Sequence, residues 1–144
     1  MINTIKKILT SLLLVSLWTS SLFAESFDHH YAAFGQLLKQ YLNNSLVNYQ
    51  AIQKSPELLN QILTQFEDVA KSDFRNWRRD EQVAFWINAY NVAVLKMIID
   101  HYPLGKGLSW RALAFPSNSI QQIPNVWKRP VLEVFGDEVN LNHI

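Results

Sequence analysis

The stretch EQVAFWINAYN, residues 81–91, decides the fold of this chain. With the ten residues that follow, it places apolar side chains on every face of a helix and leaves almost no polar face. A helix that is apolar all round is normally buried in the core of a protein. Asp80 is a suitable N-cap, and Pro103 ends the segment because the residue before a proline disfavours helical geometry. We therefore expect a buried central helix over residues 80–101, too often interrupted by polar residues to be a membrane span.

Two amphipathic helices are expected before this central helix. The first covers residues 26–42, and the second runs from Pro56 to about residue 71 with Ser55 as its N-cap. A short extended or irregular link, residues 46–52, joins them. Their apolar residues recur at spacings of three and four: Phe27, Tyr31, Phe34, Leu38 and Tyr41 in the first, and Leu58, Leu59, Ile62, Leu63, Phe66 and Val69 in the second.

The C-terminal part of the chain changes character. Residues 103–130 contain two glycines and three further prolines, which predicts a long ordered loop region with one short helix near residues 110–114. Residues 131–135 and 138–141 alternate as two strands, joined by a tight turn at Gly136-Asp137. The expected fold class is therefore α+β, mainly α-helical, with a buried central helix and a C-terminal β-hairpin.

Residues 1–24 have the order of a secretory signal peptide. Lys6 and Lys7 supply the positive charge, residues 8–23 form an uncharged apolar run, and Ala24 precedes Glu25 at the expected cleavage site. The alternative is an uncleaved membrane anchor, although the run of about 16 residues is shorter than the roughly 20 that a span requires. Cleavage would deliver a periplasmic or secreted protein with no stable membrane span.

Composition limits what the remaining residues, 25–144, can be. They fit one domain and carry 11 basic against 12 acidic residues, so no basic stripe suited to nucleic acid is expected. The chain has no cysteine, which excludes disulfides, a thiol nucleophile, thiolate metal ligands and cysteine lipidation within it. Its core must therefore form from apolar and aromatic residues alone.

Four residues of the central helix are candidates for a pocket. Asn88 and Asn91 lie three apart and share a helix face, where they either clamp the 103–130 loop or the 44–50 link, or orient a ligand or catalytic group. Trp86 and Tyr90 lie four apart and either join the core or line a ligand groove. For Lys96 we expect an apolar stem along the helix and a charge kept in water.

No cofactor or metal is expected from the sequence. The four histidines, His29, His30, His101 and His143, show no spacing that would converge on a metal ion. Neither a glycine-flanked serine nucleophile nor a phosphate-binding glycine loop occurs in the chain.

The central stretch at residues 81–91 resembles the signature of the domain-of-unknown-function 547 family (DUF547). Further segments resemble other parts of the same family domain: residues 45–49, 101–103, 118–127 and 139–144. The resemblance covers only the N-terminal part of that domain. It implies that family members continue with a Glu-His pair, a helix, and a segment holding cysteine and histidine, which could supply a nucleophile and a base.

Asn142 has the character of a helix N-cap, yet the sequence ends two residues later, so we expect a domain truncated at its C-terminus. The expected function follows: an exported, uncharacterised protein that is non-catalytic as it stands. Two alternatives stay open. One is a fragment of a hydrolase-like enzyme whose Cys/His machinery lies beyond residue 144, and the other is an envelope binding module whose groove is lined by Trp86, Tyr90 and Trp127. Its partner is then an unknown small molecule or envelope component.

Overall fold

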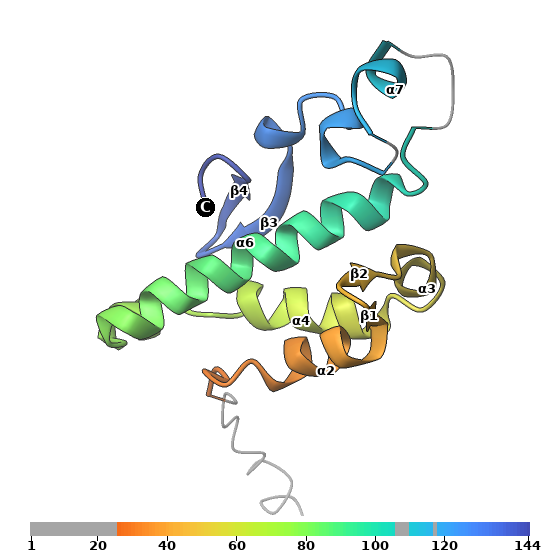
Figure 1. Cartoon of the computed structure of the whole chain (residues 1–144). Coiled ribbons are helices and arrows are strands. Elements are labelled where there is room, and N and C mark those ends of the chain that lie inside the picture. Colours follow the sequence, from red (N-terminus) through yellow and green to blue (C-terminus); the bar gives the residue numbers. More distant parts are fainter. Residues whose placement is uncertain (1–25, 106–109, 117) are drawn as a thin grey trace, which may run out of the picture.

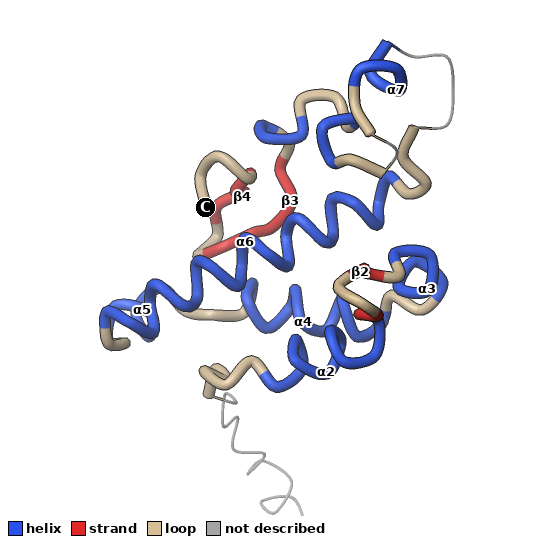
Figure 2. Tube along the Cα trace, viewed as in Figure 1, coloured by secondary structure: helices blue, strands red, loops and turns tan. Residues whose placement is uncertain are grey.

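The computed structural model describes residues 26–105, 110–116 and 118–144, and Figures 1 and 2 show their arrangement. The expected signal peptide lies outside the described residues. The elements, in chain order, are α2 (Ala32–Tyr41), β1 (Leu42–Asn43), β2 (Leu46–Val47), α3 (Tyr49–Lys54), α4 (Glu57–Glu67), α5 (Lys71–Asn76), α6 (Arg79–His101), α7 (Trp110–Ala114), the 3₁₀ turns η1 (Ile120–Gln122) and η2 (Val126–Lys128), β3 (Pro130–Val134) and β4 (Asp137–Asn140).

Helix α6 runs through the middle of the molecule (Figure 1). Helices α2, α3 and α4 lie along one side of it, and strand β3 of the antiparallel β3–β4 hairpin packs against both α6 and α4. Helix α7 sits beyond its C-terminal end. The fold is thus mainly helical with two small two-stranded sheets, one of them the C-terminal hairpin, as the sequence predicts.

The bounds of α6 are close to those expected. The helix begins at Arg79, where the Glu81 carboxylate accepts a hydrogen bond from the Arg78 backbone N–H at 2.9 Å. It ends at Tyr102, which takes extended geometry before Pro103. Within the described residues it is long and apolar enough to cross a membrane, but 44% of its most apolar window is buried inside the protein, as in a core helix.

The expectation that α6 is buried all round is wrong for its N-terminal half. Phe85, Ala89 and Val92 are fully buried, whereas Val83 is 49% exposed and Ile87 57% exposed. The sequence supplies apolar residues on every face, but the helices and the hairpin cover only part of the surface of α6. A stripe of large apolar side chains therefore faces away from the core.

An aromatic cluster forms the centre of the main core. Phe85 is its hub, with ring centroids 5.2 Å from Phe66, 5.3 Å from Phe74 and 5.6 Å from Phe27. Most of these pairs are tilted or edge-to-face, the geometry that aromatic quadrupoles favour. Phe135, from the hairpin turn, closes the cluster on the other side at 6.1 Å from Phe85. The core thus joins the N-terminal helices, α6 and the hairpin into one unit.

The first helix is shorter than expected, beginning at residue 32 and not at residue 26. Asp28 accepts hydrogen bonds from the backbone N–H groups of His30 and Ala32, both at 2.8 Å, and Tyr31 takes left-handed geometry with φ of 52°. These contacts form a tight turn that delays the helix. Phe27 still packs against the core. Its spacing of four residues from Tyr31 therefore reflects burial of both side chains and does not indicate a helix at this point.

The segment between α2 and α4 is more ordered than the expected link. Asn44 and Ser45, with φ of 47° and 64°, form the turn of a small hairpin between β1 and β2. Asn48 then caps the short helix α3 by accepting a hydrogen bond from the Ala51 backbone N–H at 3.0 Å. Ser55 is the C-cap of α3 and not the N-cap of α4, whose N-cap is Pro56. The short polar helices α3 and α5 were not predicted, because they lack the repeated apolar spacing that indicates a helix in a sequence.

The C-terminal hairpin forms as expected, but its turn lies one residue earlier. Val134 pairs with Asp137, so the two turn residues are Phe135 and Gly136, with φ of 57° and 84°. A bulky residue rarely takes left-handed geometry. Phe135 does so because its ring is packed against Phe74, with centroids 4.9 Å apart.

Within the described residues of the 103–130 region, α7 falls at residues 110–114 as predicted. Gln122 is buried and its amide donates hydrogen bonds to the backbone carbonyls of Phe115, at 3.1 Å, and Pro116. Gly105 lies against the same side chain, with φ of 82°. This clamp fixes the segment that carries α7 to a second apolar cluster, formed by Ala93, Met97, Ile98, Leu104, Ile123, Val126 and Leu141.

Candidate functional site

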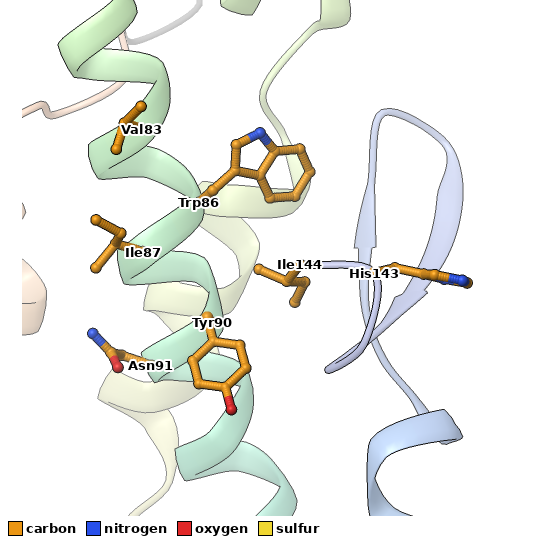
Figure 3. Close-up of a pocket in the computed structure, with 7 residues that line it drawn as sticks. All are labelled: Val83, Trp86, Ile87, Tyr90, Asn91, His143 and Ile144. Atoms are coloured by element: carbon orange, nitrogen blue, oxygen red, sulfur yellow. The ribbon is translucent and has the colours of Figure 1, made fainter.

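The uncovered stripe of α6 forms one wall of a groove of about 600 Å³, which we call the α6 groove. The opposite wall is the segment that follows β4 (Figure 3). The residues lining the groove are Val83, Trp86, Ile87, Tyr90, Asn91, His143 and Ile144.

The α6 wall follows from helical spacing. Val83, Ile87 and Asn91 lie four residues apart, as do Trp86 and Tyr90, so two adjacent rows of side chains face the groove. Trp86 is half-buried and fixed from behind by Phe85 and Phe135, with ring centroids 5.3 Å and 5.9 Å away. The wall is therefore a rigid apolar surface on a helix whose other side is held in the core.

The second wall depends on the last residues of the chain. The Asn142 backbone N–H donates to the Asn140 side chain at 3.0 Å and to the Trp127 carbonyl at 3.1 Å. These bonds turn the segment back toward α6, so that Ile144 points at the helix while the His143 ring points away from it (Figure 3). Ile144 also packs against both apolar clusters.

The polar groups of the α6 groove are few. The exposed Asn91 amide and the Tyr90 hydroxyl can donate or accept hydrogen bonds, and His143 lies at the rim. The side chains that line it include no serine, threonine, cysteine, aspartate, glutamate or lysine. The arrangement suits binding of an apolar or aromatic group with one or two hydrogen bonds.

Three of the four residues predicted from the sequence meet in the groove: Trp86, Tyr90 and Asn91. Trp127, expected beside Trp86 and Tyr90 in a binding groove, lines a different groove, and Asn88 does not line the α6 groove either. The Asn88 side-chain amide donates to the Ala84 carbonyl at 2.9 Å, one turn earlier in α6.

Asn88 also faces Tyr31. Burial raises the pKa of the Tyr31 phenol, and the neighbouring Asn88 amide partly offsets that rise. Of the two alternatives for the asparagines, a clamp on the 103–130 loop or the 44–50 link is not seen among the described residues. Asn88 contacts the N-terminal segment and its own helix, and Asn91 is exposed.

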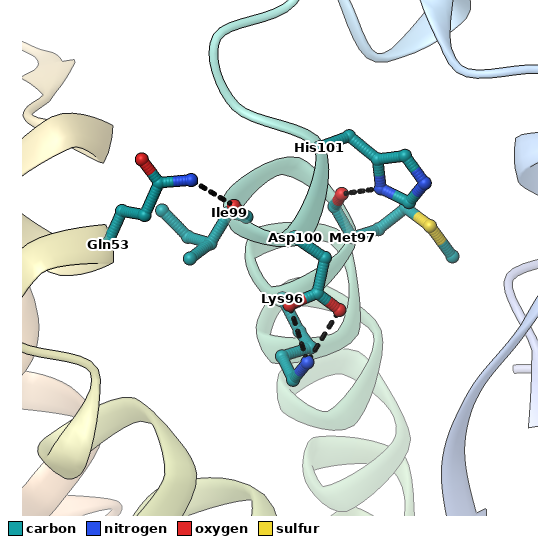
Figure 4. A network of polar contacts seen from close by, with 6 residues as sticks. All are labelled: Gln53, Lys96, Met97, Ile99, Asp100 and His101. Carbon is teal, nitrogen blue, oxygen red and sulfur yellow. Dashed lines mark hydrogen bonds and ion pairs between the residues drawn. The ribbon is translucent and has the colours of Figure 1, made fainter.

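A polar network at the C-terminal end of α6 is structural (Figure 4). Lys96 pairs with Asp100 at 2.5 Å, and its side chain keeps 30% exposure, so its charge stays at the surface as expected. Gln53 donates to the carbonyls of Ile99 and Tyr102 at 3.0 Å and 2.9 Å. These bonds satisfy carbonyls at the helix end and attach α3 to α6.

Metal binding has no support in the part of the chain that the structure describes, where no three histidine, cysteine or acidic residues gather. That His143 and Ile144 line the groove was not predicted from the sequence, because their approach to α6 is a tertiary contact. The exposed stripe could have been recognised from the sequence. Val83, Ile87 and Asn91 lie four residues apart on one helix face, and the polar Asn91 in this otherwise apolar row indicates a face that reaches water.

Comparison with known proteins places this half of the molecule in a family. Residues 74–144 match the family model described as "Protein of unknown function, DUF547". Through its C-terminal half the chain therefore belongs to the DUF547 family, and the match includes α6, the hairpin and every residue lining the α6 groove. The resemblance at residues 45–49 lies outside the matched range. No curated protein and no solved structure matches the chain.

Proposed function

We propose that the protein is exported and serves as an envelope binding module that holds an apolar or aromatic ligand group in the α6 groove. The observation that carries this proposal is the exposure of large apolar side chains on the most regular element of the fold. Ile87 is 57% exposed and Val83 49% exposed, beside the half-buried rings of Trp86 and Tyr90. Contiguous exposed apolar surface of this kind is typical of binding sites.

A ligand in this groove gains binding energy mainly from removing apolar surface from water, about 25 cal/mol for each Å². The wall requires little rearrangement, because Trp86 is already fixed between Phe85 and Phe135. A preformed wall lowers the entropy cost of binding. Asn91 and the Tyr90 hydroxyl then select ligands that carry a hydrogen-bonding group at the matching edge.

We also propose that residues 25–144 alone do not catalyse hydrolysis. Covalent hydrolysis requires a nucleophile within reach of a base, and the lining residues supply only the imidazole of His143. That ring points away from α6 (Figure 3). The hydrolase alternative rests on residues beyond 144 that the family resemblance implies, and assaying ester and amide hydrolysis by the purified chain tests it: turnover that depends on His143 would refute the binding-only proposal.

Binding is tested by thermal unfolding in the presence of peptidoglycan fragments and of detergent-solubilised envelope lipids. A ligand at one hundred times its Kd should raise stability by about 2.7 kcal/mol. We expect Ile87→Ser to abolish the shift and Leu46→Ser to keep it. Leu46 is a matched control, since it is 75% exposed on β2, away from the groove. No shift with either preparation, or equal shifts in both variants, would contradict the proposal.

Export is supported by the residue order of the first 24 positions. Expression of the full gene in a Gram-negative host, followed by fractionation and N-terminal sequencing, should give a periplasmic product that begins at Glu25. Replacing Lys6, Lys7 and the centre of the apolar run should leave the chain in the cytoplasm. A cytoplasmic product with residues 1–24 intact would refute export, and a membrane-bound product retaining them would favour the anchor.

A further inference from the structure

The region around α7 carries a second exposed apolar surface, whose residues do not line the α6 groove. Trp110 is 64% exposed, Leu113 is 86% exposed and Trp127 is 39% exposed. Trp110 and Leu113 lie three residues apart on α7 and therefore on the same helix face. Tryptophan and leucine held in water at the tip of a molecule are unfavourable unless another surface covers them.

Basic side chains lie among these apolar residues. The Arg111 guanidinium lies 4.7 Å from the centre of the Trp110 ring, and Arg111 also lines a groove of about 290 Å³ together with Trp127. Lys128 and Arg129 follow Trp127 directly and are exposed. We call these six residues the tryptophan patch: Trp110, Arg111, Leu113, Trp127, Lys128 and Arg129.

The charge of the chain is segregated around this patch. No acidic residue occurs between Asp100 and Glu133, although the whole chain has 12. Four of its basic residues fall in the same interval. The expected exported form is slightly acidic overall, whereas every charged residue in the interval that holds the tryptophan patch is basic.

We propose that the tryptophan patch docks the protein on the surface of an anionic phospholipid bilayer. Tryptophan is favoured at the level of lipid headgroups, where its ring is in an apolar environment and its N–H remains hydrated. Lysine and arginine beside it are attracted to anionic lipids. Leu113 extends from the same face and enters the acyl boundary, as the apolar residues of interfacial helices do. A protein partner would not require the exclusion of acidic residues from the whole interval.

Vesicle binding alone is a poor readout, because the apolar run at residues 8–23 would tether every variant of the full chain. The test therefore follows one side chain. The full chain with Trp18→Phe is mixed with vesicles of phosphatidylcholine and phosphatidylglycerol, part of whose acyl chains are brominated to quench tryptophan. The contribution of Trp110 is the difference in fluorescence between this chain and the same chain with Trp110→Phe. The contribution of Trp77, which packs 5.6 Å from Phe85 in the aromatic cluster, is obtained in the same way as a matched control.

We expect brominated lipid to quench the Trp110 contribution and to leave that of Trp77 unchanged. Because every variant is tethered, the readout is the ratio of quenched to unquenched Trp110. Lys128→Gln with Arg129→Gln should lower this ratio roughly 30-fold, since each charge near an anionic surface contributes about fivefold. Leu113→Ser should reduce the quenching, whereas Leu46→Ser, on the far β1–β2 hairpin, should not.

Three results would overturn the proposal. The first is a Trp110 contribution that brominated anionic lipid does not quench. The second is equal quenching in pure phosphatidylcholine, which would remove the role of the basic residues. The third is protection of Trp110 from aqueous iodide that rises with protein concentration in the absence of lipid, which would assign the patch to a contact between two copies of the chain.

Discussion

Replacing Phe85 with alanine removes the ring at the centre of the aromatic cluster. Phe85 is fully buried, and its ring lies within 5.3 Å, centre to centre, of Phe66, Phe74 and Trp86. Truncation of a buried phenylalanine costs about 3–5 kcal/mol, from lost transfer energy and the cavity left behind. A domain of this size has a free energy of unfolding of roughly 5–15 kcal/mol, so the loss is a large part of the total.

Ile87→Ala is the matched control, two residues further along the same helix. Ile87 is 57% exposed in the α6 groove, so its truncation should change the free energy of unfolding by no more than about 0.5 kcal/mol. Urea unfolding followed by far-ultraviolet circular dichroism measures both variants without interference from tryptophan fluorescence. A common slope with urea concentration shows that the midpoints report stability.

The comparison tests the orientation of α6. A cost below about 1 kcal/mol for Phe85→Ala would mean that the cluster tolerates a hole, against the behaviour of packed cores. A cost above about 2 kcal/mol for Ile87→Ala would mean that this residue is covered in solution, since exposed truncations rarely reach that value. Either result would refute the reasoning that assigns one face of α6 to the core and another to a ligand.

Three further variants test other parts of the structure. Backbone hydrogen bonds from Ala32 hold the pKa of Asp28 below its ordinary value, so its stabilising effect is present above that ordinary value and is lost as the pH falls through the lowered pKa; Asp28→Asn should therefore lower the melting temperature at pH 7 but not at pH 2, as calorimetry can show. Gly105→Ala would place a Cβ 2.5 Å from Gln122 Oε1 at a φ of 82°, and should accelerate hydrogen exchange in residues 110–116, measured by mass spectrometry. Phe135→Asn gives the hairpin a preferred Asn-Gly turn yet removes the packed ring, and urea unfolding should show a net loss of about 1–3 kcal/mol because packing outweighs turn propensity.

The elements that were predictable from the sequence are those with a local cause. Pro103 and the continuous apolar run define α6 to within one residue at its start, and α7 falls where expected. The hairpin was also predictable, but its register was not. Glycine was expected at the first turn position, whereas Phe135 takes that position because its ring packs into a cluster built from distant segments.

The candidate site was predictable only in part, for the same reason. Helical spacing brings Trp86, Tyr90 and Asn91 together, and it fails for Asn88, which faces Tyr31 instead. The wall formed by the residues after β4 is a tertiary contact, for which the sequence carries no periodic signal. The exposed stripe of α6 likewise depends on which faces of the helix the other elements cover.

The aromatic cluster also sets the order in which the chain can fold. Its rings come from positions as far apart as Phe27 and Phe135, so its last member emerges late in synthesis. Contacts of high sequence separation form slowly because a long loop must first close. Until the hairpin arrives, Phe74, Phe85 and Trp86 lack one of their packing partners, and a chain in that state exposes apolar surface to chaperones. The cluster cannot close before Phe135 is synthesised, and a chain that is not yet fully packed is the form that the proposed export requires.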